Sequence, residues 1–366
     1  MLSASPAAPP TPRTRRPHRP LLACTAVMAV LVVVTLCAMV VDDRRLLGES
    51  IWLKPFKFGL AFVLYTATLA WLLSFPHRGS RVTWWMGTAF AVTGIVDVGF
   101  IVVQAARGTF SHFNNQTDAV NTIGQTVFMS GVLGLFAANL VIAVLLSWQR
   151  VTDRPTSRAI SAGLGIAVLG MAMAYLVGGT GPQRVTDAYG RPVELGAGHT
   201  VMPGDPPVRD GVGAGVPVLR WSTEGGDLRI PHFLGMHGIQ LLILAAVLLA
   251  RYAPRVPWLR TERTRARIVG VLALSYTGWM TVLLWQALRG HPVTRPDAAT
   301  LAAFAVLAAG TVAALALVRA RARHPRPVLP EIEAAPTVPI PVRRLSPVQR
   351  LSAAVRRPGP RPPIAR

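Results

Sequence analysis

The chain has 366 residues, of which 51% are hydrophobic and only 15% are charged, and its mean hydropathy is +0.42. An ordinary soluble domain carries about 25% charged residues, so this composition excludes a typical soluble protein and indicates one whose surface lies in lipid. The formal net charge of +22 would suggest a nucleic-acid partner in a soluble protein. Here the charges occupy short segments between apolar runs, which argues against nucleic acid as a partner.

A membrane-spanning helix needs roughly 20 mainly apolar residues, because it must cross about 30 Å of hydrocarbon. The apolar runs do not alternate with polar residues as the strands of a membrane barrel do. We therefore predict an all-α integral membrane bundle of about eight helices in a lipid bilayer. In chain order the predicted spans are Leu21–Val41, Phe56–Phe75, Trp84–Gln104, Gln125–Trp148, Ala159–Val177, Phe233–Arg251, Ile268–Leu288 and Ala298–Val318.

These spans divide the chain into three parts: a basic tail over residues 1–20, a membrane domain over 21–319, and a basic, Pro-rich tail over 320–366 that we expect to be disordered. The first span is longer than the apolar core of a signal peptide, so we interpret it as uncleaved. The loop 178–231 holds 12 glycines and 7 prolines, so little regular helix is expected in it. Loops of this length are usually functional or disordered.

Basic residues resist export across a membrane, so their distribution predicts orientation. With the N-terminus inside, the inner segments hold 26 of the 38 basic residues and 4 of the 16 acidic ones, which accounts for the whole net charge. Arginine outnumbers lysine heavily and Ala, Gly, Pro and Val abound, as in bacteria with GC-rich coding. We predict a bacterial inner-membrane protein with both termini in the cytoplasm.

Most histidines then fall on the outer side. The candidate metal ligands are His112, His199, His232 and His237. His232 and His237 follow Pro231, which can open a helix. They stand about 140° apart around its axis, so they should contact different neighbours. Two interpretations stay open: hydrogen bonds to nearby helices and backbone, or a role in holding a transition metal or haem or in relaying protons.

The segment around these two histidines adds Asp227 and Arg229 before the helix and Gln240 within it. Gln240 shares a helical face with His237, since the two residues are three positions apart. We treat these three polar side chains as candidates for ligand binding or proton relay.

Asp97 is the one acidic residue well inside a predicted span. Burying a carboxylate there is costly, so we expect it to face the bundle interior and to have a partner. Gln104 lies on the same helical face, which leads toward Arg107. A structural, hydrogen-bonded aspartate and a functional site are equally open interpretations.

The chain's two lysines, Lys54 and Lys57, stand within four residues of each other at the outer end of the second predicted span. In an arginine-biased chain this pair can mean that an ammonium group is needed. Interfacial anchoring together with Trp52 is the alternative.

The strings IWLKPFKFGL, QAARGTFSHFN and WSTEGGDLRIPHFLGMHGIQ resemble those of a group of uncharacterised multi-pass membrane proteins from actinobacteria. The resemblance covers the membrane domain and excludes the tails. It implies no particular activity, but it implies that the three segments form a common outer site.

Three functions fit these observations. The first is a binding or transport protein with a small polar ligand or metal ion at the outer end. The second is a haem- or metal-dependent membrane redox enzyme, with His112 and His237 as the haem ligands. The third is a structural or assembly protein that binds a partner through its outer loop.

Overall fold

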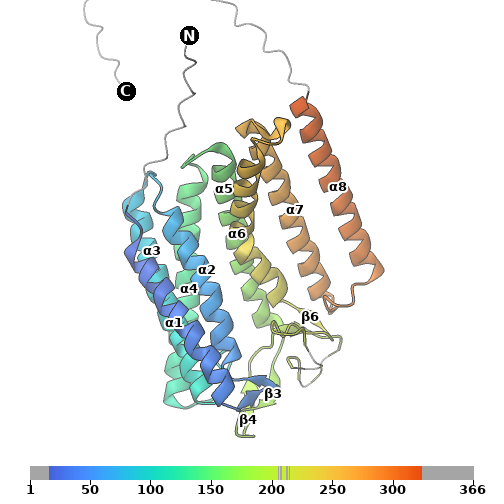
Figure 1. Cartoon of the computed structure of the whole chain (residues 1–366). Helices are drawn as coiled ribbons and strands as arrows, with labels where there is room; N and C mark the ends of the chain where they lie inside the picture. The colour runs from blue at the N-terminus through green and yellow to red at the C-terminus, as the bar shows by residue number, and fades with distance from the viewer. Residues whose placement is uncertain (1–15, 205, 207, 212, 214, 324–366) are drawn as a thin grey trace, which may run out of the picture. The chain divides into compact units, whose positions relative to one another are not determined.

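The computed structural model describes residues 16–323 apart from 205, 207, 212 and 214. Within them, eight helices are long and apolar enough to cross a membrane, which confirms the predicted all-α bundle (Figure 1). The eight helices are α1 (Arg19–Val41), α2 (Leu53–Leu72), α3 (Ser80–Ala106), α4 (Ala119–Ser147), α5 (Arg154–Met173), α6 (Arg229–Tyr252), α7 (Glu262–Leu288) and α8 (Ala298–Arg323). Most of the two predicted tails lies outside the described residues.

Each predicted span corresponds to one of these helices, but several helices begin a turn or more earlier than predicted. α5 begins at Arg154 and α7 at Glu262, where Thr261 accepts a hydrogen bond from the backbone N–H of Thr264. These first turns are polar, so a search for apolar runs does not see them. α5 ends at Met173 and continues as the 3-10 helix η1 (Ala174–Gly179).

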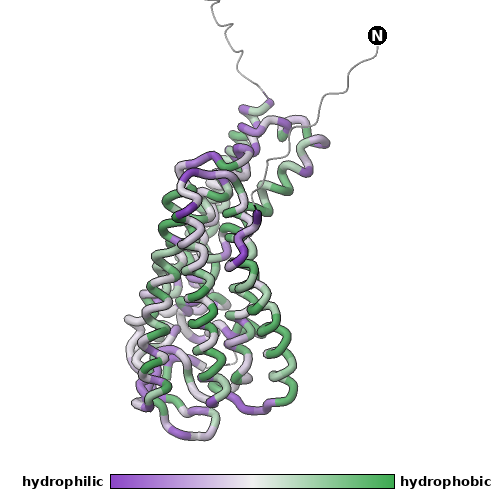
Figure 2. The backbone as a smooth tube through the Cα atoms, turned by 90° about the vertical axis from the view of Figure 1, so that its left-hand side faces the viewer, coloured by the Kyte–Doolittle hydropathy of each residue, from purple (hydrophilic) through white to green (hydrophobic). Residues whose placement is uncertain are grey.

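The bundle has two ends of different character. We call one the loop end, formed by residues 42–52, 107–118, 180–228 and 289–297, and the other the arginine end, formed by 73–79, 148–153 and 253–261. Figure 2 shows hydrophilic segments gathered at both ends and hydrophobic chain between them. This arrangement is the one expected for a bundle that crosses a bilayer.

The loop end carries short antiparallel strand pairs. β1 (Arg45–Leu46) pairs with β2 (Glu49–Ser50), and β3 (Gln183–Thr186) pairs with β4 (Pro192–Leu195). β5 (Thr200–Val201) pairs with β6 (Gly226–Asp227), which brings the middle of the long loop next to its last residues, just before α6. A bridge between Asn114 and Leu195 ties the α3–α4 connection to the same loop.

Two apolar cores meet at α5. One core joins side chains of α1 to α5 with Ile239 of α6, and the other joins α5, α6 and α7, with Ala159 and Val269 fully buried in it. α8 packs on α7 and on the 3-10 helix η2 (Pro257–Leu259), and Thr300 is its one side chain classed as buried. The arrangement is therefore two helical groups with α5 in common, and α8 at the periphery (Figure 1).

Small residues bring α5 and α6 close together. A Cβ atom on Gly170 would lie 2.6 Å from the backbone nitrogen of Met236, and one on Gly235 would lie 2.4 Å from the Cα of Gly170. No real side chain tolerates such contacts, so glycine is required on both helices. This crossing fixes the start of α6, which carries His232, against the end of α5.

Candidate functional site

A cavity of about 770 Å³ lies at the loop end, between α2, α3 and α4 on one side and α5 and α6 on the other. Most of its wall is apolar and much of that wall is aromatic. Phe58, Phe62 and Tyr65 contribute from α2, and Phe128 and Phe136 contribute from α4. Its volume is within the range of about 300–1,000 Å³ that is usual for small-molecule sites.

The cavity reaches far into the bundle. Lys54 and Tyr65 both line it, and a helix rises 1.5 Å per residue, so it follows α2 for about 16 Å. That depth is roughly half of the 30 Å hydrocarbon thickness of a bilayer. The cavity therefore has a polar mouth at the loop end and an apolar interior at the depth of the spans.

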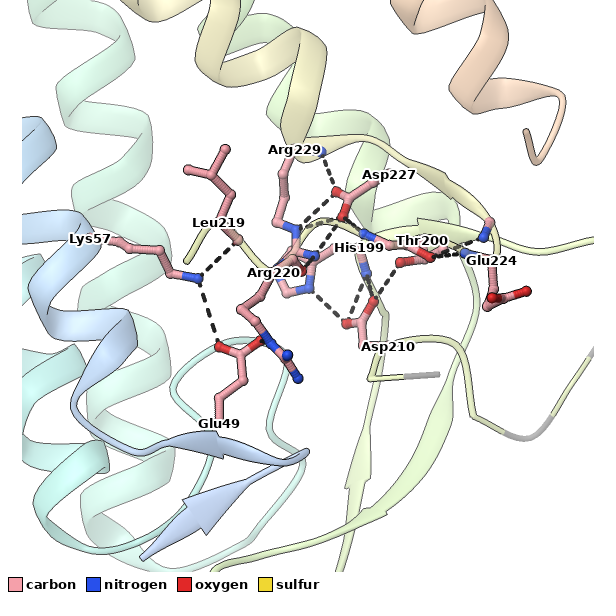
Figure 3. A network of polar contacts seen from close by, with 12 residues as sticks. Glu49, Lys57, His199, Thr200, Asp210, Leu219, Arg220, Glu224, Asp227 and Arg229 are labelled. Atoms are coloured by element: carbon pink, nitrogen blue, oxygen red, sulfur yellow. Dashed lines mark hydrogen bonds and ion pairs between the residues drawn. The ribbon is translucent and has the colours of Figure 1, made fainter. Parts of the chain in front are cut away.

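Charged groups surround the mouth (Figure 3). The Glu49 carboxylate lies 3.8 Å from the Lys57 ammonium and accepts a hydrogen bond of 3.1 Å from Arg220. Lys57 also donates to the backbone carbonyl of Leu219 at 3.2 Å. Lys54 lines the cavity too, and no hydrogen bond or ion pair to its ammonium is formed by the described residues.

His199 and Asp210 form an oriented pair on the loop side of the mouth. The Nδ1 of His199 lies 2.8 Å from the Asp210 carboxylate, which also accepts hydrogen bonds from Gln183 and from the hydroxyl of Thr200. Burial raises the pKa of the Asp210 carboxyl, but the charge and hydrogen bonds of His199 outweigh it and hold the pKa below its usual range. The carboxylate thus stays ionised and fixes the orientation of the imidazole.

Arg229 and Asp227 tie the loop to the first turn of α6. The Asp227 side chain is fully buried; its carboxylate accepts from the Nε of Arg229 at 2.9 Å and from the backbone N–H of Ser222 at 2.8 Å. Arg229 also donates to the carbonyl of Arg220 at 2.9 Å. This pairing holds the Arg229 guanidinium at the cavity wall.

His112 is enclosed by rings. Its ring centroid lies 4.5 Å from that of Phe128, 5.7 Å from that of Phe58 and 6.2 Å from that of His199. Burial, followed by the nearby Lys54 charge, holds the pKa of His112 well below its usual value. The imidazole is therefore neutral at neutral pH.

The two histidines of α6, His232 and His237, also line the cavity. The Nδ1 of His232 lies 2.8 Å from the carbonyl of Gly170 and donates to it, which leaves Nε2 as the acceptor nitrogen. His237 stands about a turn and a half further along the helix.

The structure brings together seven of the twelve predicted site residues and leaves five outside the cavity. Those lining it are Lys54, Lys57, His112, His199, Arg229, His232 and His237. Those outside the lining are Asp97, Gln104, Arg107, Asp227 and Gln240. Gln104 donates to Asn121, and Arg107 donates to the Asp118 carboxylate, so both stabilise the turn after α3. Gln240 donates to Thr68 of α2 at 3.1 Å.

Asp97 faces the bundle interior as expected, with 3% of its surface exposed. The expectation of a partner is wrong: neither carboxyl oxygen has a hydrogen-bond partner among the described residues. Gly131 of α4 presents bare backbone to the carboxyl, so that a Cβ there would lie 2.0 Å from Oδ1.

The sequence did not single out the aromatic wall. Phe58, Phe62, Tyr65 and Phe128 lie within predicted spans, where an aromatic residue is equally expected in a core or facing lipid. No group of three or more His, Cys, Asp or Glu residues in the described part of the chain could hold a metal ion. The assignment of the four histidines as metal ligands therefore stays a prediction without a supporting ligand set.

Comparisons of the chain with protein-family models, with curated proteins and with solved structures found no match.

Proposed function

We propose that this multi-pass membrane protein binds a lipid-like amphiphile in the cavity, with the ligand's anionic group at Lys54 and its hydrocarbon chain among the aromatic side chains. The observation that carries the proposal is the pairing of an unpartnered ammonium with a deep apolar wall in one cavity. An ammonium at the edge of an apolar space is costly unless a negative group meets it. A small polar ligand would leave most of that wall uncovered.

The charges at the mouth favour a ligand with a single negative charge. Four cations contribute there, and three carboxylates partly neutralise them. The cations are Lys54, Lys57, Arg220 and Arg229, and the carboxylates are Glu49, Asp210 and Asp227. Counted without the imidazoles of His112 and His199, these groups leave one positive charge, which fits a carboxylate or a phosphodiester better than a diphosphate.

Access from the lipid phase is consistent with the exposed part of the cavity wall. Leu60 and Leu64 of α2, Met129 of α4 and Leu241 of α6 line the cavity and are 43–51% exposed. They lie at the depth of the spans, where the surrounding solvent is hydrocarbon. We infer that the ligand's chain enters sideways from the bilayer.

We propose that the protein lies in a bacterial inner membrane with its loop end outside. The support is the predicted distribution of basic residues, since the arginine end would carry the whole net charge. A reporter that is active only outside the cytoplasm, fused after Arg366, should stay silent. An active reporter would overturn this orientation.

Photo-crosslinking tests the binding proposal. Palmitate and phosphatidylglycerol carrying a diazirine on the chain are added to the purified protein, and the labelled peptides are mapped. We expect labels on the cavity walls of α2 and α4, and Lys54→Gln should weaken labelling roughly 10-fold or more, since a charge-assisted hydrogen bond contributes about 1.5–3 kcal/mol. Arg184→Gln removes a charge from the same end outside the cavity and should change nothing.

Two results would reject the proposal: labels spread over the lipid-facing surfaces of all helices, or equal labelling of wild type and Lys54→Gln. A label confined to one of the two probes tells whether the anionic group is a carboxylate or a phosphodiester.

A second candidate function is acid–base chemistry on the bound ligand. His199 is oriented by Asp210, lines the cavity, and has no hydrogen bond to its Nε2 from the described residues. That arrangement is typical of a general base. A haem or transition-metal enzyme remains the other catalytic hypothesis; an absorption band of haem or a stoichiometric metal content in the purified protein would replace the amphiphile by a cofactor in this cavity.

A further inference from the structure

A second cavity, of about 520 Å³, lies at the arginine end. Its lining residue Ser161 is separated from Met171 of the first cavity by about 15 Å along α5. It is formed by the end of α4, the first two turns of α5 and the first two turns of α7. Five of its lining residues are arginines, namely Arg150, Arg154, Arg158, Arg263 and Arg267.

The arginines form two ladders. Arg154 and Arg158 are one helical turn apart on α5, and Arg263 and Arg267 are one turn apart on α7. Residues four positions apart share a face and differ in height by about 6 Å. Arg158 reaches across to α7, because a Cβ on Gly270 would lie 3.3 Å from its Nη1. The two ladders therefore line a common space.

The positive charge in this space is largely uncompensated. Arg150 lies 3.3 Å from the Glu262 carboxylate, which also accepts from the backbone N–H of Arg154. Among the described residues, no acidic side chain forms an ion pair with Arg154, Arg158, Arg263 or Arg267. α5 and α7 also both begin here, so the positive ends of their dipoles add to the same field.

We propose that this cavity holds the headgroup of a phospholipid that carries two phosphates, drawn from the adjacent leaflet. Four guanidiniums on two ladders, without an acidic partner among the described residues, offer one pair for each phosphate, and guanidinium binds phosphate oxygens in a bidentate geometry. One phosphate would leave two guanidiniums without a counter-charge.

The surroundings favour a lipid over a soluble phosphate compound. Trp148 lines the cavity and is 88% exposed, and a tryptophan in that setting is typical of the interface between headgroups and chains. The arginines stand within the first two turns of spanning helices, which is headgroup depth. Basic cavities between membrane helices commonly bind such lipids.

Native mass spectrometry of the purified full-length protein, titrated with defined lipids in detergent, tests the proposal. Diphosphatidylglycerol should bind at one copy and more tightly than phosphatidylglycerol, which has a single phosphate. The variant Arg158→Gln/Arg267→Gln should bind diphosphatidylglycerol roughly 25-fold more weakly, from about 5-fold for each arginine. The control Arg78→Gln/Arg81→Gln makes the same charge change at the same end but outside the cavity, and it should bind like wild type.

A second variant guards against a folding defect in the first. Ala266→Glu places a carboxylate in the cavity while it keeps every arginine, and it should also weaken binding. If Arg158→Gln/Arg267→Gln and the control Arg78→Gln/Arg81→Gln lost the same affinity for diphosphatidylglycerol, the lipid would be attracted by the general positive charge of this end and not by a binding site, which would overturn the proposal. Equal affinity for the one-phosphate lipid would overturn the two-phosphate assignment, and tight binding of inorganic pyrophosphate without lipid would overturn the lipid source.

Discussion

The carboxyl of Asp97 provides a sharp test of the helix packing. It is buried between α3 and α4 without a hydrogen-bond partner among the described residues, so it should weaken the fold. We expect Asp97→Ala to stabilise the protein, because alanine removes both oxygens from the apolar interior. Asp97→Asn keeps two unpartnered polar atoms and should give little gain.

The magnitude follows from two opposing effects. An unsatisfied buried polar group costs about 1–3 kcal/mol in proteins, and an aspartate at the centre of a membrane helix costs about 2.5–3.5 kcal/mol on insertion scales. The small space that alanine leaves costs about 1 kcal/mol. We therefore expect a net gain of about 1–2 kcal/mol, read as a higher melting temperature in detergent from the fluorescence of the nine tryptophans.

A double-mutant cycle with Gly131 tests the contact itself. Gly131→Ala places a methyl group 2.0 Å from Asp97 Oδ1, so it should destabilise the wild type, but it should be tolerated when Asp97 is alanine. A coupling energy of about 1–3 kcal/mol is expected. A loss of stability in Asp97→Ala, or additive effects of the two substitutions, would refute the proposed geometry.

Three further expectations concern the loop end and the crossing beneath it. Gly170→Val should destabilise the protein by about 3 kcal/mol, because its side chain would meet the backbone of α6. Asp227→Asn should cost about 3–5 kcal/mol, because Arg229 would be left with an unbalanced buried charge. Since the pKa of His112 is lowered in the folded state, the unfolded chain takes up the proton first. Stability should therefore fall as the pH drops below about 6.5, by up to about 1.4 kcal/mol per pH unit, and His112→Gln should reduce this slope.

Matched variants control these measurements. Gly165→Ala changes a helical glycine of α5 with open space around it and should be neutral or slightly stabilising. Glu224→Gln removes an exposed ion pair with Arg295 at the same end and should change stability by less than about 1 kcal/mol. If either control matched its test variant, burial would not be the cause of the effect.

The sequence was sufficient for the membrane architecture, because span length and apolar composition follow directly from the thickness of a bilayer. All eight predicted spans correspond to helices, and the errors lie at polar first turns such as those that begin at Arg154 and Glu262. The close crossing of α5 and α6 does not follow in the same way. Only the structure shows that Gly170 meets Gly235, since the sequence does not say which helices are neighbours.

The sequence predicts the polar residues of the candidate site but not its aromatic wall. Histidines and lysines stand out in an apolar, arginine-rich chain, and so Lys54, His112 and His199 were identified. The wall formed by Phe62 and Tyr65 was not identified, because an apolar residue in a span has no signature that separates a cavity from a core. This wall is the reason that the cavity suits an amphiphile better than the small polar molecule that the sequence suggests.

For Asp97, the sequence predicts the burial of the side chain but not its surroundings. The cost of a membrane carboxyl correctly predicted its burial, but it also led to the expectation of a partner, and the described residues supply none: the carboxyl lies against the bare backbone of Gly131. Whether a buried carboxyl has a hydrogen-bond partner depends on which helix packs against it, and the sequence of one helix does not determine that.

The most direct test of the central claim is a native mass spectrum of the protein released from its own membrane. The Arg158→Gln/Arg267→Gln background removes the proposed second lipid from the spectrum. We expect one amphiphile with a single negative charge per chain, retained when loosely bound lipids are stripped. It should be lost when Val132→Trp fills the apolar part of the first cavity. The proposal would be contradicted if the same molecules were bound with and without Val132→Trp. It would also be contradicted if a metal ion or a water-soluble compound were bound in place of an amphiphile.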